Sequence, residues 1–460
     1  MTHYRSNRRK FLAQSLVVAG SAAVPSFSVR RLHSAEPASE RLRVGCIGVG
    51  GRGSFVGGIA CQQGVKIACA DVDRQRAERF AGGDKCAVYT DYRELLDRND
   101  VEVVTVGTPD HWHTKIVMDA VKAGKDVYSE KPLTLTIDEG KKLCRAVKQT
   151  GRVVQVGTQQ RSSPQFLMAV ALAQSGRLGK VLKATCYIGA GPTGGPFPTA
   201  DPPPHLNWDV WLGQCPKVPY TPQRCHGSFR WWLEYSGGKL TDWGAHHLDI
   251  AQWALGYDNS GPVEIEGRGQ FPMMPDDLDP VAFFAGRAKI PNGFNTATQF
   301  EVTLKFASGS TMVVTHGPGN GIMIEGEKGR IYVNRARLSG KPIEELTEAD
   351  RDWLAEETIR LYKGKPIDPS SVTTEGTNTG RDKASVDHMR NLFACVKDRS
   401  QPVSDVFTHH RAVSSCHLCN IAMLLGRKLR WDPAKEDFVG DEQASALVAR
   451  PQRPPYAIEG

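Results

Sequence analysis

The sequence has no long basic run in its body and no nucleic-acid-binding motif. Its formal net charge of +8 is small for 460 residues, and part of that charge lies near the N-terminus, between Arg5 and Arg31. A charge of this size attracts anions only weakly and without specificity. We therefore expect no nucleic-acid partner.

Cysteine follows no pattern that indicates a disulfide framework, because the eleven cysteines are odd in number and scattered. The one Cys-x-x-Cys stretch is Cys416-His417-Leu418-Cys419. A haem attachment needs histidine directly after the second cysteine, where Asn420 stands, and a zinc site needs a second ligand pair nearby. We interpret the stretch as two buried thiols one helical turn apart and expect no metal.

No segment is long and apolar enough to predict a membrane-spanning helix. The nearest candidate, Phe11 to about Phe27, is short and contains Pro25. It follows the twin arginines of Arg8-Arg9-Lys10, and this order of basic, apolar and small residues resembles a twin-arginine export signal. We expect residues 1–35 to be that signal and the protein to be periplasmic or otherwise exported. A disordered basic tail is the alternative.

The composition, with 40% hydrophobic and 23% charged residues, is ordinary for a globular protein, and the length allows two domains. Strand-like apolar runs alternate with helical patterns in the first part of the chain, which predicts a doubly wound parallel sheet over residues 41–160. The predicted strands are Leu42–Ile47, Val65–Ala70, Val101–Val106, Asp126–Ser129 and Val153–Val156.

The composition changes after this region. Residues 189–230 are rich in Gly, Pro, Trp and His, and the interleaved aromatics favour a long ordered loop with a function. Later runs alternate polar and apolar residues, which predicts a mostly antiparallel sheet. We expect an α/β Rossmann domain followed by an α+β domain over residues 166–460. The alternating runs are Val263–Gln270, Thr296–Phe306, Thr311–His316 and Ile322–Glu325.

A dinucleotide-binding turn is predicted at Gly48-Val49-Gly50-Gly51-Arg52-Gly53, which fits G-x-G-x-x-G between a strand and a helix. Its glycines allow a tight turn, close approach of the backbone to a pyrophosphate, and close helix packing. Asp71 ends the next strand about 20 residues further on, where an acid accepts hydrogen bonds from the adenosine ribose. This acid favours NAD, although Arg74 and Arg76 leave NADP possible.

Two further segments fall at the carboxyl edge of the predicted sheet, where ligands bind. Thr108-Pro109-Asp110 follows one strand and Glu130-Lys131-Pro132 follows the next. A lysine in this position can contact both the nicotinamide and a substrate hydroxyl, and its charge would stabilise a developing alkoxide. We assign eleven residues to cofactor binding: Gly48, Gly50, Gly51, Arg52, Gly53, Asp71, Thr108, Pro109, His113, Glu130 and Lys131.

A second cluster of chemical residues is expected on one helix. Asp242, His246 and Asp249 stand at i, i+4 and i+7 and would share one face. The carboxylate of Asp242 could orient the imidazole of His246, which could then take a proton while a hydride leaves the same carbon. His247 would point elsewhere and is interpreted as structural.

These motifs together resemble the glucose–fructose oxidoreductase/inositol dehydrogenase family (Gfo/Idh/MocA). The resemblance covers the chain after the predicted signal and rests on the glycine turn, Thr108–His113, Glu130-Lys131-Pro132 and the Gly237–Asp249 stretch. It implies a Rossmann domain joined to an open-sheet domain that mediates oligomerisation, as a dimer or tetramer. It also implies catalytic positions at Lys131, Asp242 and His246. The C-terminal tail looks like that of an often exported bacterial subgroup.

The long aromatic segment before the second cluster supplies candidates for substrate contact, because aromatic faces and hydrogen-bonding groups suit sugar rings. Gln159 and Arg161, just after the last predicted Rossmann strand, could reach the same cleft. The predicted substrate residues are Arg161, Trp208, His226, Arg230, Trp231, Tyr235, Asp242 and His246.

We predict an NAD(P)-dependent oxidoreductase that transfers hydride between nicotinamide and a hydroxyl carbon of a sugar, polyol or sugar derivative. Because free NAD is scarce outside the cytoplasm, an exported enzyme would keep its cofactor tightly bound. A redox-neutral glycosidase or epimerase that acts through a transient keto-sugar is one alternative. A nucleotide-binding protein without catalysis is the other.

Overall fold

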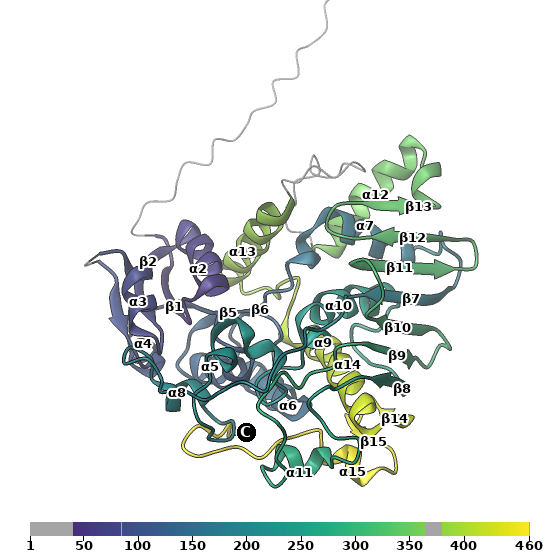
Figure 1. Cartoon of the computed structure of the whole chain (residues 1–460). Coiled ribbons are helices and arrows are strands. Elements are labelled where there is room, and N and C mark those ends of the chain that lie inside the picture. The colour runs from purple at the N-terminus through teal and green to yellow at the C-terminus, as the bar shows by residue number, and fades with distance from the viewer. Residues whose placement is uncertain (1–39, 84, 364–379, 460) are drawn as a thin grey trace, which may run out of the picture. The chain divides into compact units, whose positions relative to one another are not determined.

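The computed structural model of the chain describes residues 40–83, 85–363 and 380–459. The predicted export signal of residues 1–35 lies outside these residues. Residues from Arg41 onward form one unit by their contacts and contain two sheets (Figure 1). No described helix is long and apolar enough to cross a membrane, and the described residues contain no group of metal-ligating side chains.

The first sheet is fully parallel and has the strand order β3-β2-β1-β4-β5-β6. Its central strands are buried along their whole length, as parallel strands covered by helices on both faces must be. The order reverses between β1 and β4, which places a ligand-binding crevice at their carboxyl ends. The strands are β1 Arg43–Ile47, β2 Val65–Ala70, β3 Ala87–Tyr89, β4 Val103–Val106, β5 Asp126–Ser129 and β6 Val154–Val156. The helices are α2 Gly51–Gln63, α3 Arg74–Ala81, α4 Tyr92–Leu96, α5 Asp110–Lys122 and α6 Ile137–Thr150.

The second sheet has nine strands in the order β13-β12-β11-β7-β10-β9-β8-β14-β15. All of its paired strands are antiparallel except β7 and β10. The α/β fold followed by a mostly antiparallel α+β sheet is therefore confirmed. The strands are β7 Val181–Tyr187, β8 Glu264–Gly269, β9 Phe300–Lys305, β10 Thr311–Thr315, β11 Gly321–Gly326, β12 Gly329–Val333, β13 Leu338–Gly340, β14 Leu429–Asp432 and β15 Asp437–Phe438.

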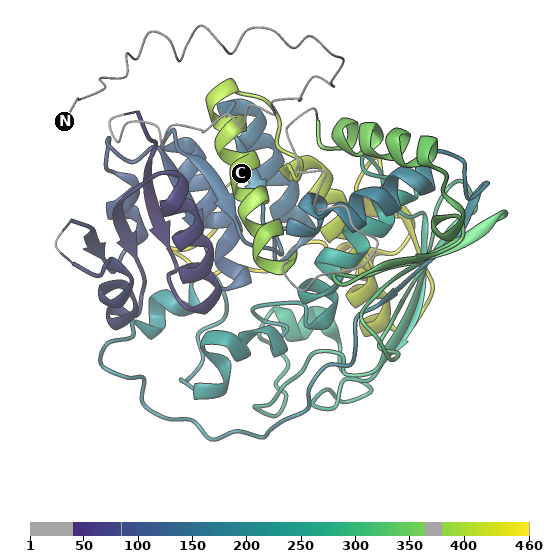
Figure 2. The ribbon, with the colours of Figure 1, turned by 90° about the horizontal axis from the view of Figure 1, so that it is seen from above.

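Helices cover one face of this second sheet (Figure 2). β9 shows the consequence, since Phe300 and Val302 are buried while Glu301 is exposed. The covering helices are α7 Pro164–Gln174, α10 Gly244–Ala254, α12 Glu348–Leu361 and α14 Val406–Leu425. Cys416 and Cys419 are buried in α14, as the sequence predicts. The remaining helices are α9 Lys239–Asp242, α11 Pro280–Phe284, α13 Gly380–Asp398 and α15 Glu442–Ser445.

The aromatic segment between β7 and α9 is ordered and has a small core of its own. It contains α8 Trp208–Leu212 and a 3-10 turn at His226–Trp231. Several hydrogen bonds join it to the Rossmann domain: for example, Trp112 Nε1 donates to the Trp211 carbonyl at 3.0 Å, and the Asn207 amide donates to the Val72 carbonyl at 3.1 Å. We call residues 189–236 the aromatic insert.

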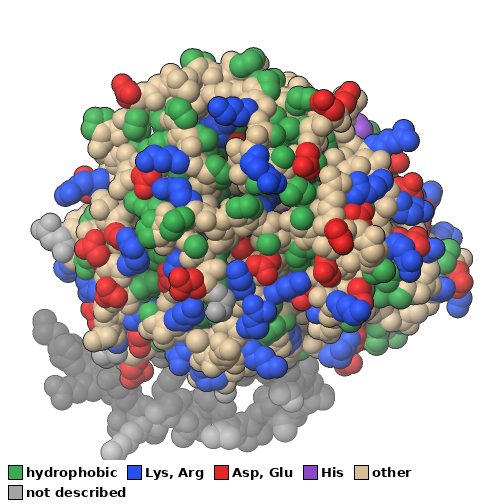
Figure 3. Space-filling view, turned by 90° about the horizontal axis from the view of Figure 1, so that it is seen from below, with side chains coloured by type: hydrophobic (Ala, Val, Ile, Leu, Met, Phe, Trp, Pro, Cys, Tyr) green, Lys and Arg blue, Asp and Glu red, His purple; other side chains and the backbone are tan. Residues whose placement is uncertain are grey.

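The surface drawn in Figure 3 shows acidic and basic side chains interspersed. No single sign of charge dominates that face.

Candidate active site

A cavity of about 640 Å³ lies at the carboxyl edge of the parallel sheet and extends from the glycine turn to α9 and α10. The aromatic insert forms the opposite wall. Sixteen of the predicted site residues line it: Gly48, Gly50, Gly51, Arg52, Asp71, Thr108, Pro109, His113, Glu130, Lys131, Gln159, His226, Arg230, Trp231, Asp242 and His246.

The glycine turn has the geometry that a dinucleotide needs. Gly48 has φ +72°, which favours glycine, and a Cβ on Gly53 would lie 1.8 Å from the Gly48 carbonyl oxygen. The absence of a side chain at Gly53 therefore lets the start of α2 pack closely on the turn. Gly53 itself does not line the cavity. A Cβ on Gly51 would meet nothing within 4 Å, so the backbone there is open to a ligand. These residues fit a pyrophosphate at the start of α2.

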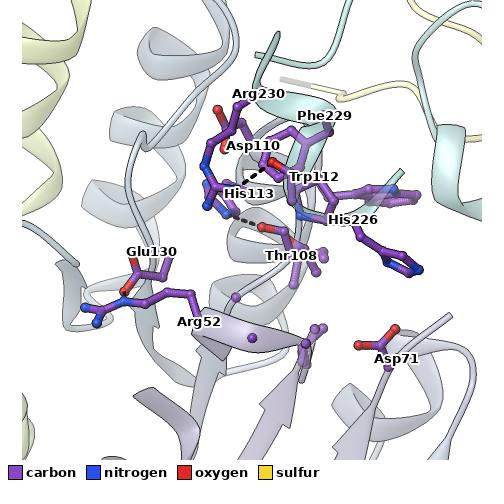
Figure 4. A pocket seen from close by; sticks show the side chains of 18 of the residues that line it. Arg52, Asp71, Thr108, Asp110, Trp112, His113, Glu130, His226, Phe229 and Arg230 are labelled. Atoms are coloured by element: carbon purple, nitrogen blue, oxygen red, sulfur yellow. Dashed lines mark hydrogen bonds and ion pairs between the residues drawn. The ribbon is translucent and has the colours of Figure 1, made fainter. Parts of the chain in front are cut away.

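Asp71 lies at the far end of the same turn. Its two carboxylate oxygens accept from the backbone amides of Val49 and Asp73, both at 2.9 Å. Burial raises the pKa of Asp71 to about 6, although these amides and the charge of Arg76 oppose the rise. His226 of the aromatic insert lies across the cavity from Asp71 (Figure 4). A ribose between them would be enclosed on both sides.

Four other predicted cofactor residues, Arg52, Thr108, His113 and Glu130, support the cavity wall through two separate sets of contacts (Figure 4). Arg52 Nε donates to Glu130 Oε1 at 2.8 Å. His113 Nδ1 lies 2.6 Å from the Pro132 carbonyl oxygen and its Nε2 lies 2.9 Å from the Thr108 carbonyl oxygen. His113 therefore ties the loop after β4 to the loop after β5, which fixes the position of the lysine before Pro132.

Lys131 and Asp242 form an ion pair across the cavity. The lysine Nζ lies 2.7 Å from Asp242 Oδ1 and 3.0 Å from the Asp242 carbonyl oxygen, and Arg230 Nε lies 3.5 Å from the same Oδ1. Burial raises the pKa of Asp242, but the charges of Lys131 and Arg230 outweigh burial and hold it below its usual value. Asp242 is thus an anion that positions two cations.

The predicted helix through Asp242, His246 and Asp249 is interrupted at Trp243, because α9 ends at Asp242 and α10 begins at Gly244. Asp242 and His246 line the same cavity, but Asp249 does not. Asp249 is fully buried and pairs with Arg161. The hypothesis that Asp242 orients His246 also needs correction, because its carboxylate is paired with Lys131 instead.

His246 lies in the same cavity and is almost fully buried. Its Nδ1 makes no hydrogen bond to the described part of the chain. Burial lowers the pKa of His246 well below 6.5, and the charges of Arg335 and Lys131 lower it further. The ring is therefore neutral at neutral pH and can accept a proton. Its neighbour His247 lies outside the lining and bonds Asn320 at 2.7 Å.

Three predicted substrate residues do not reach the cavity lining. Arg161 is buried, where its guanidinium pairs with Asp249 at 2.7 Å and with Asp258 at 2.9 Å. Tyr235 is fully buried, and its hydroxyl lies 3.2 Å from Arg224 Nη1. Trp208 stacks on Trp211 with ring centroids 4.7 Å apart. Each of these three side chains contacts other side chains of the protein and not the cavity.

The structure also adds residues to the predicted lining. Arg335, in the turn between β12 and β13, stacks its guanidinium 4.6 Å from the centre of the Trp243 ring. No local signal could have placed it, because it comes from the other sheet. Asp110, the last residue of the Thr108-Pro109-Asp110 segment, accepts a hydrogen bond from Ser236 Oγ at 2.5 Å, and burial raises its pKa. The added lining also includes Arg76, Trp112, Phe229 and Trp243.

Comparison with known proteins adds three findings. The model of an oxidoreductase family with an NAD-binding Rossmann fold (Gfo/Idh/MocA) matches residues 42–158, and the model of that family's C-terminal alpha/beta domain matches residues 196–340 and 344–458. The uncharacterized oxidoreductase YrbE of Bacillus subtilis is 24% identical over 368 residues, which are 75% of this chain and 92% of YrbE. The alpha-N-acetylgalactosaminidase of Shewanella oneidensis is 32% identical over 158 residues, which are 32% of this chain and 34% of that protein.

Among solved structures, a levoglucosan dehydrogenase in complex with NADH and L-sorbose is similar with a TM-score of 0.61 and 18% identity. The match covers 85% of this chain and 98% of the dehydrogenase. At this identity the similarity concerns the fold.

Proposed function

Because this chain belongs to the Gfo/Idh/MocA oxidoreductase family and has its NAD-binding Rossmann domain, we propose that it oxidises a hydroxyl carbon of a sugar or polyol, or reduces the matching ketone. One observation carries the proposal: Lys131 Nζ lies 2.7 Å from Asp242 Oδ1 in the cavity that begins at the glycine turn. A neutral His246 lines that same cavity.

The nucleotide would be held by the first half of the cavity. The backbone at Gly50 and the open backbone at Gly51 would hold the pyrophosphate beside the guanidinium of Arg76, and Asp71 would accept from the ribose hydroxyls. When bound, the nicotinamide supplies the hydride acceptor and donor. The ribose acid disfavours a 2′-phosphate, which supports NAD.

Lys131 and His246 have different roles toward the substrate. The ammonium group of Lys131 would donate to the reacting oxygen and stabilise the charge that develops on it as the proton leaves. His246 would take that proton during oxidation and return it during reduction. Asp242 acts on Lys131, because its carboxylate holds the ammonium group in one position.

The named relatives support a sugar as substrate. The structure of levoglucosan dehydrogenase contains NADH and L-sorbose, and an inositol 2-dehydrogenase of Rubrobacter xylanophilus is 34% identical over 149 residues, which are 31% of this chain and 42% of that enzyme. The aromatic wall with Trp231 and Trp243 suits the apolar face of a sugar ring.

A redox-neutral glycosidase is the second candidate. One relative is named an alpha-N-acetylgalactosaminidase, although the match spans only about a third of either chain. The aromatic insert favours a retained cofactor, because it covers the ribose end of the cavity and is joined to the loop after β2 and to α5. A cofactor that stays bound suits both an exported enzyme and a cycle of oxidation and re-reduction.

The test begins with the purified full chain. Nucleotide released by denaturation is identified by mass spectrometry, and the native protein is then incubated with sugars, polyols and glycosides. Reduced nucleotide or an oxidised sugar is the expected product. Cleaved glycoside with unchanged nucleotide would establish the second candidate instead. Lys131→Ala should abolish turnover, whereas Lys115→Ala, a control in the α5 ion pair with Asp119, should not.

Export and assembly complete the proposal. We propose that the twin arginines Arg8 and Arg9 direct export and that the protein forms a homo-oligomer. Replacement of both arginines by lysine should leave the protein in the cytoplasmic fraction, and light scattering of the purified protein should give more than one chain's mass. A periplasmic double variant or a monomer would contradict the respective proposal.

A further inference from the structure

We propose that Cys46 and Cys61 form a disulfide when the protein meets an oxidising environment, and that this bond ties β1 to α2 around the glycine turn. The inference does not depend on the proposed reaction. It concerns a modification site in the Rossmann domain, of which the scattered cysteines of the sequence give no indication.

The two sulfur atoms already lie side by side between β1 and α2. Cys46 Sγ is 3.9 Å from Cys61 Sγ, within the hydrogen-bond distance of two thiols. Cys46 is fully buried, whereas Cys61 is only half-buried. A disulfide needs a sulfur–sulfur distance of about 2.05 Å, so the two atoms must approach by about 2 Å. Rotation of the half-buried Cys61 side chain about its Cα–Cβ bond can supply this movement.

The face of α2 that meets β1 directs the two side chains toward each other. Gly57 stands one helical turn before Cys61, so both lie on one face of the helix. A Cβ on Gly57 would lie 3.1 Å from Cys46 Sγ, so the glycine leaves the space that this sulfur occupies. Helical side chains lean toward the N-terminus of their helix. The Cys61 side chain therefore leans toward Gly57 and Cys46.

The backbone around the pair is held in register by hydrogen bonds. Arg41 Nη2 donates to the carbonyls of Gln62 at 2.8 Å and Gly64 at 2.6 Å. The Val65 amide donates to the Leu42 carbonyl at 2.8 Å. The end of α2 is thus fastened to the residues that precede β1. This frame keeps the two thiols close while the domain is folded, and such closeness gives each thiol a high effective concentration for the other.

The surroundings of Cys61 make it the thiol that reacts first. Its hydrogen bond with Cys46 lowers the pKa of Cys61, and the charges of Lys66 and Arg41 lower it further against the effect of burial. The same hydrogen bond and burial raise the pKa of Cys46 well above its usual value. Thiolates are the nucleophiles of disulfide exchange, so Cys61 attacks the oxidant and the buried Cys46 completes the bridge.

The oxidant is a low-molecular-weight or protein disulfide. The Cys61 thiolate attacks one of its sulfur atoms, forms a mixed disulfide and releases the first thiolate. Cys46 then attacks the Cys61 sulfur, and its proton passes to the second leaving sulfur. Two electrons move from the cysteine pair to the oxidant, which ends as two thiols. The compartment outside the cytoplasm, to which export is proposed above, contains oxidants of this class.

The bond would close a loop that contains the whole glycine turn, Gly48–Gly53, and most of α2. A crosslink across a loop of about 15 residues stabilises the folded state mainly by restricting the unfolded chain. We therefore expect the melting temperature of the oxidised protein to exceed that of the reduced protein by about 6 °C. The bridged unit is the one whose open backbone at Gly51 fits a pyrophosphate.

The test maps the cysteines of the purified full chain after incubation with reduced or with oxidised glutathione. Free thiols are alkylated, and the protein is digested with trypsin, which cleaves after arginine and lysine. Arg52 lies between the two cysteines, so Cys46 and Cys61 fall on separate peptides, 44–52 and 53–66. The bridge appears in mass spectrometry as these two peptides joined. The number of free thiols should fall by two from the eleven of the reduced protein.

Two variants make the result specific. Cys61→Ser is preferred to a change at the fully buried Cys46, because it disturbs the core less. It should form no bridge and should melt at the same temperature under both conditions. Cys144→Ser is the matched control, because Cys144 is also half-buried on a Rossmann helix, and it should form the bridge as the wild type does. The buried Cys416 and Cys419 should stay reduced throughout.

Three results would overturn the inference. A wild type that keeps all its thiols, or keeps glutathione on Cys61 without a bridge, would show that Cys46 does not reach Cys61. A bridge from either residue to Cys69 or Cys86, which belong to the same core cluster, would show that another pair forms. A bridged protein that melts no higher than the reduced one would show that the bond does not stabilise the domain. None of these measurements uses turnover, so a failure of the proposed reaction leaves them unchanged.

Discussion

Replacing Arg161 tests whether this residue stabilises the protein core or binds the substrate. The guanidinium makes four hydrogen bonds of 2.7 to 3.1 Å with Asp249 and Asp258, and it lies 4.5 Å from the centre of the Trp253 ring. Arg161→Leu removes all of these contacts. The carboxylate of Asp249, which is 0% exposed, then stays buried without its main partner.

Breaking a buried ion pair from one side costs about 3–5 kcal/mol of unfolding free energy. At about 2 °C per kcal/mol for a long chain, the melting temperature should fall by about 6–10 °C. The sign of the pH dependence should also change. In the wild type, Arg161 lowers the pKa of Asp249 against the effect of burial, so this group contributes stability that is lost as pH falls. In the variant burial, which is the largest influence on that pKa, is opposed by His409 but no longer by Arg161, so we expect the pKa to be raised and stability to be lost as pH rises.

The assay is thermal unfolding of both proteins at pH 5 and pH 8, with kinetics on the folded fraction. The deficit should be larger at pH 8, and the KM for the sugar should stay within about threefold of the wild type. Arg161→Leu combined with Asp249→Leu should recover much of the loss, because no unpaired carboxylate remains at that position. An unchanged melting temperature with a strongly raised KM would refute the reasoning and restore Arg161 as a substrate residue.

Three further predictions concern the cavity. Lys131→Ala should lower kcat about 100-fold or more, measured as product formed per nucleotide-loaded molecule of the purified variant. His246→Gln should lower kcat by about 10²–10⁴, whereas His247→Gln on the same helix should not. The pH profile of kcat/KM should show its acid limb below pH 6.5, because burial lowers the pKa of His246. Since burial raises the pKa of Asp71 to about 6, NAD affinity measured by calorimetry should weaken as pH falls through 6 and should be weaker at all pH values in Asp71→Asn.

The Rossmann half could be predicted from the sequence because its signals are local. Each buried strand is a short apolar run, and the glycines of the turn stand at fixed offsets from the end of β1. The positive φ of Gly48 and the contact between Gly53 and the Gly48 carbonyl are consequences of that spacing. The carboxyl edge of the sheet then places Thr108 and Lys131 near the same ligand without any knowledge of the second domain.

The pairing inside the site could not be predicted in the same way. Helical periodicity joins Asp242 to His246, but the chain breaks the helix at Trp243, and the true partner Lys131 is 111 residues away. For Arg161 the sequence predicts a contact that the structure does not have. Its position just after the last Rossmann strand suggested that it reaches the substrate cleft, but its guanidinium pairs with Asp249 and Asp258 in the core. In both cases the partner of the side chain is a charged residue far away in the sequence. Helical periodicity concerns only neighbouring residues and cannot predict such a pair.

The charge of Arg335 should also appear in the pH dependence of the chemical step. Proton uptake by His246 places a new positive charge near Lys131 and Arg335, whose charges already lower its pKa beyond the effect of burial. Two unit charges 4 Å apart interact by about 4 kcal/mol at an effective dielectric constant of 20. Arg335→Gln removes one of these charges, so the pKa of His246 should rise and the acid limb of kcat/KM should move to higher pH, whereas Arg337→Gln, outside the cavity lining, should leave the limb in place. Coincident limbs for the wild type and Arg335→Gln would show that this charge does not act on His246.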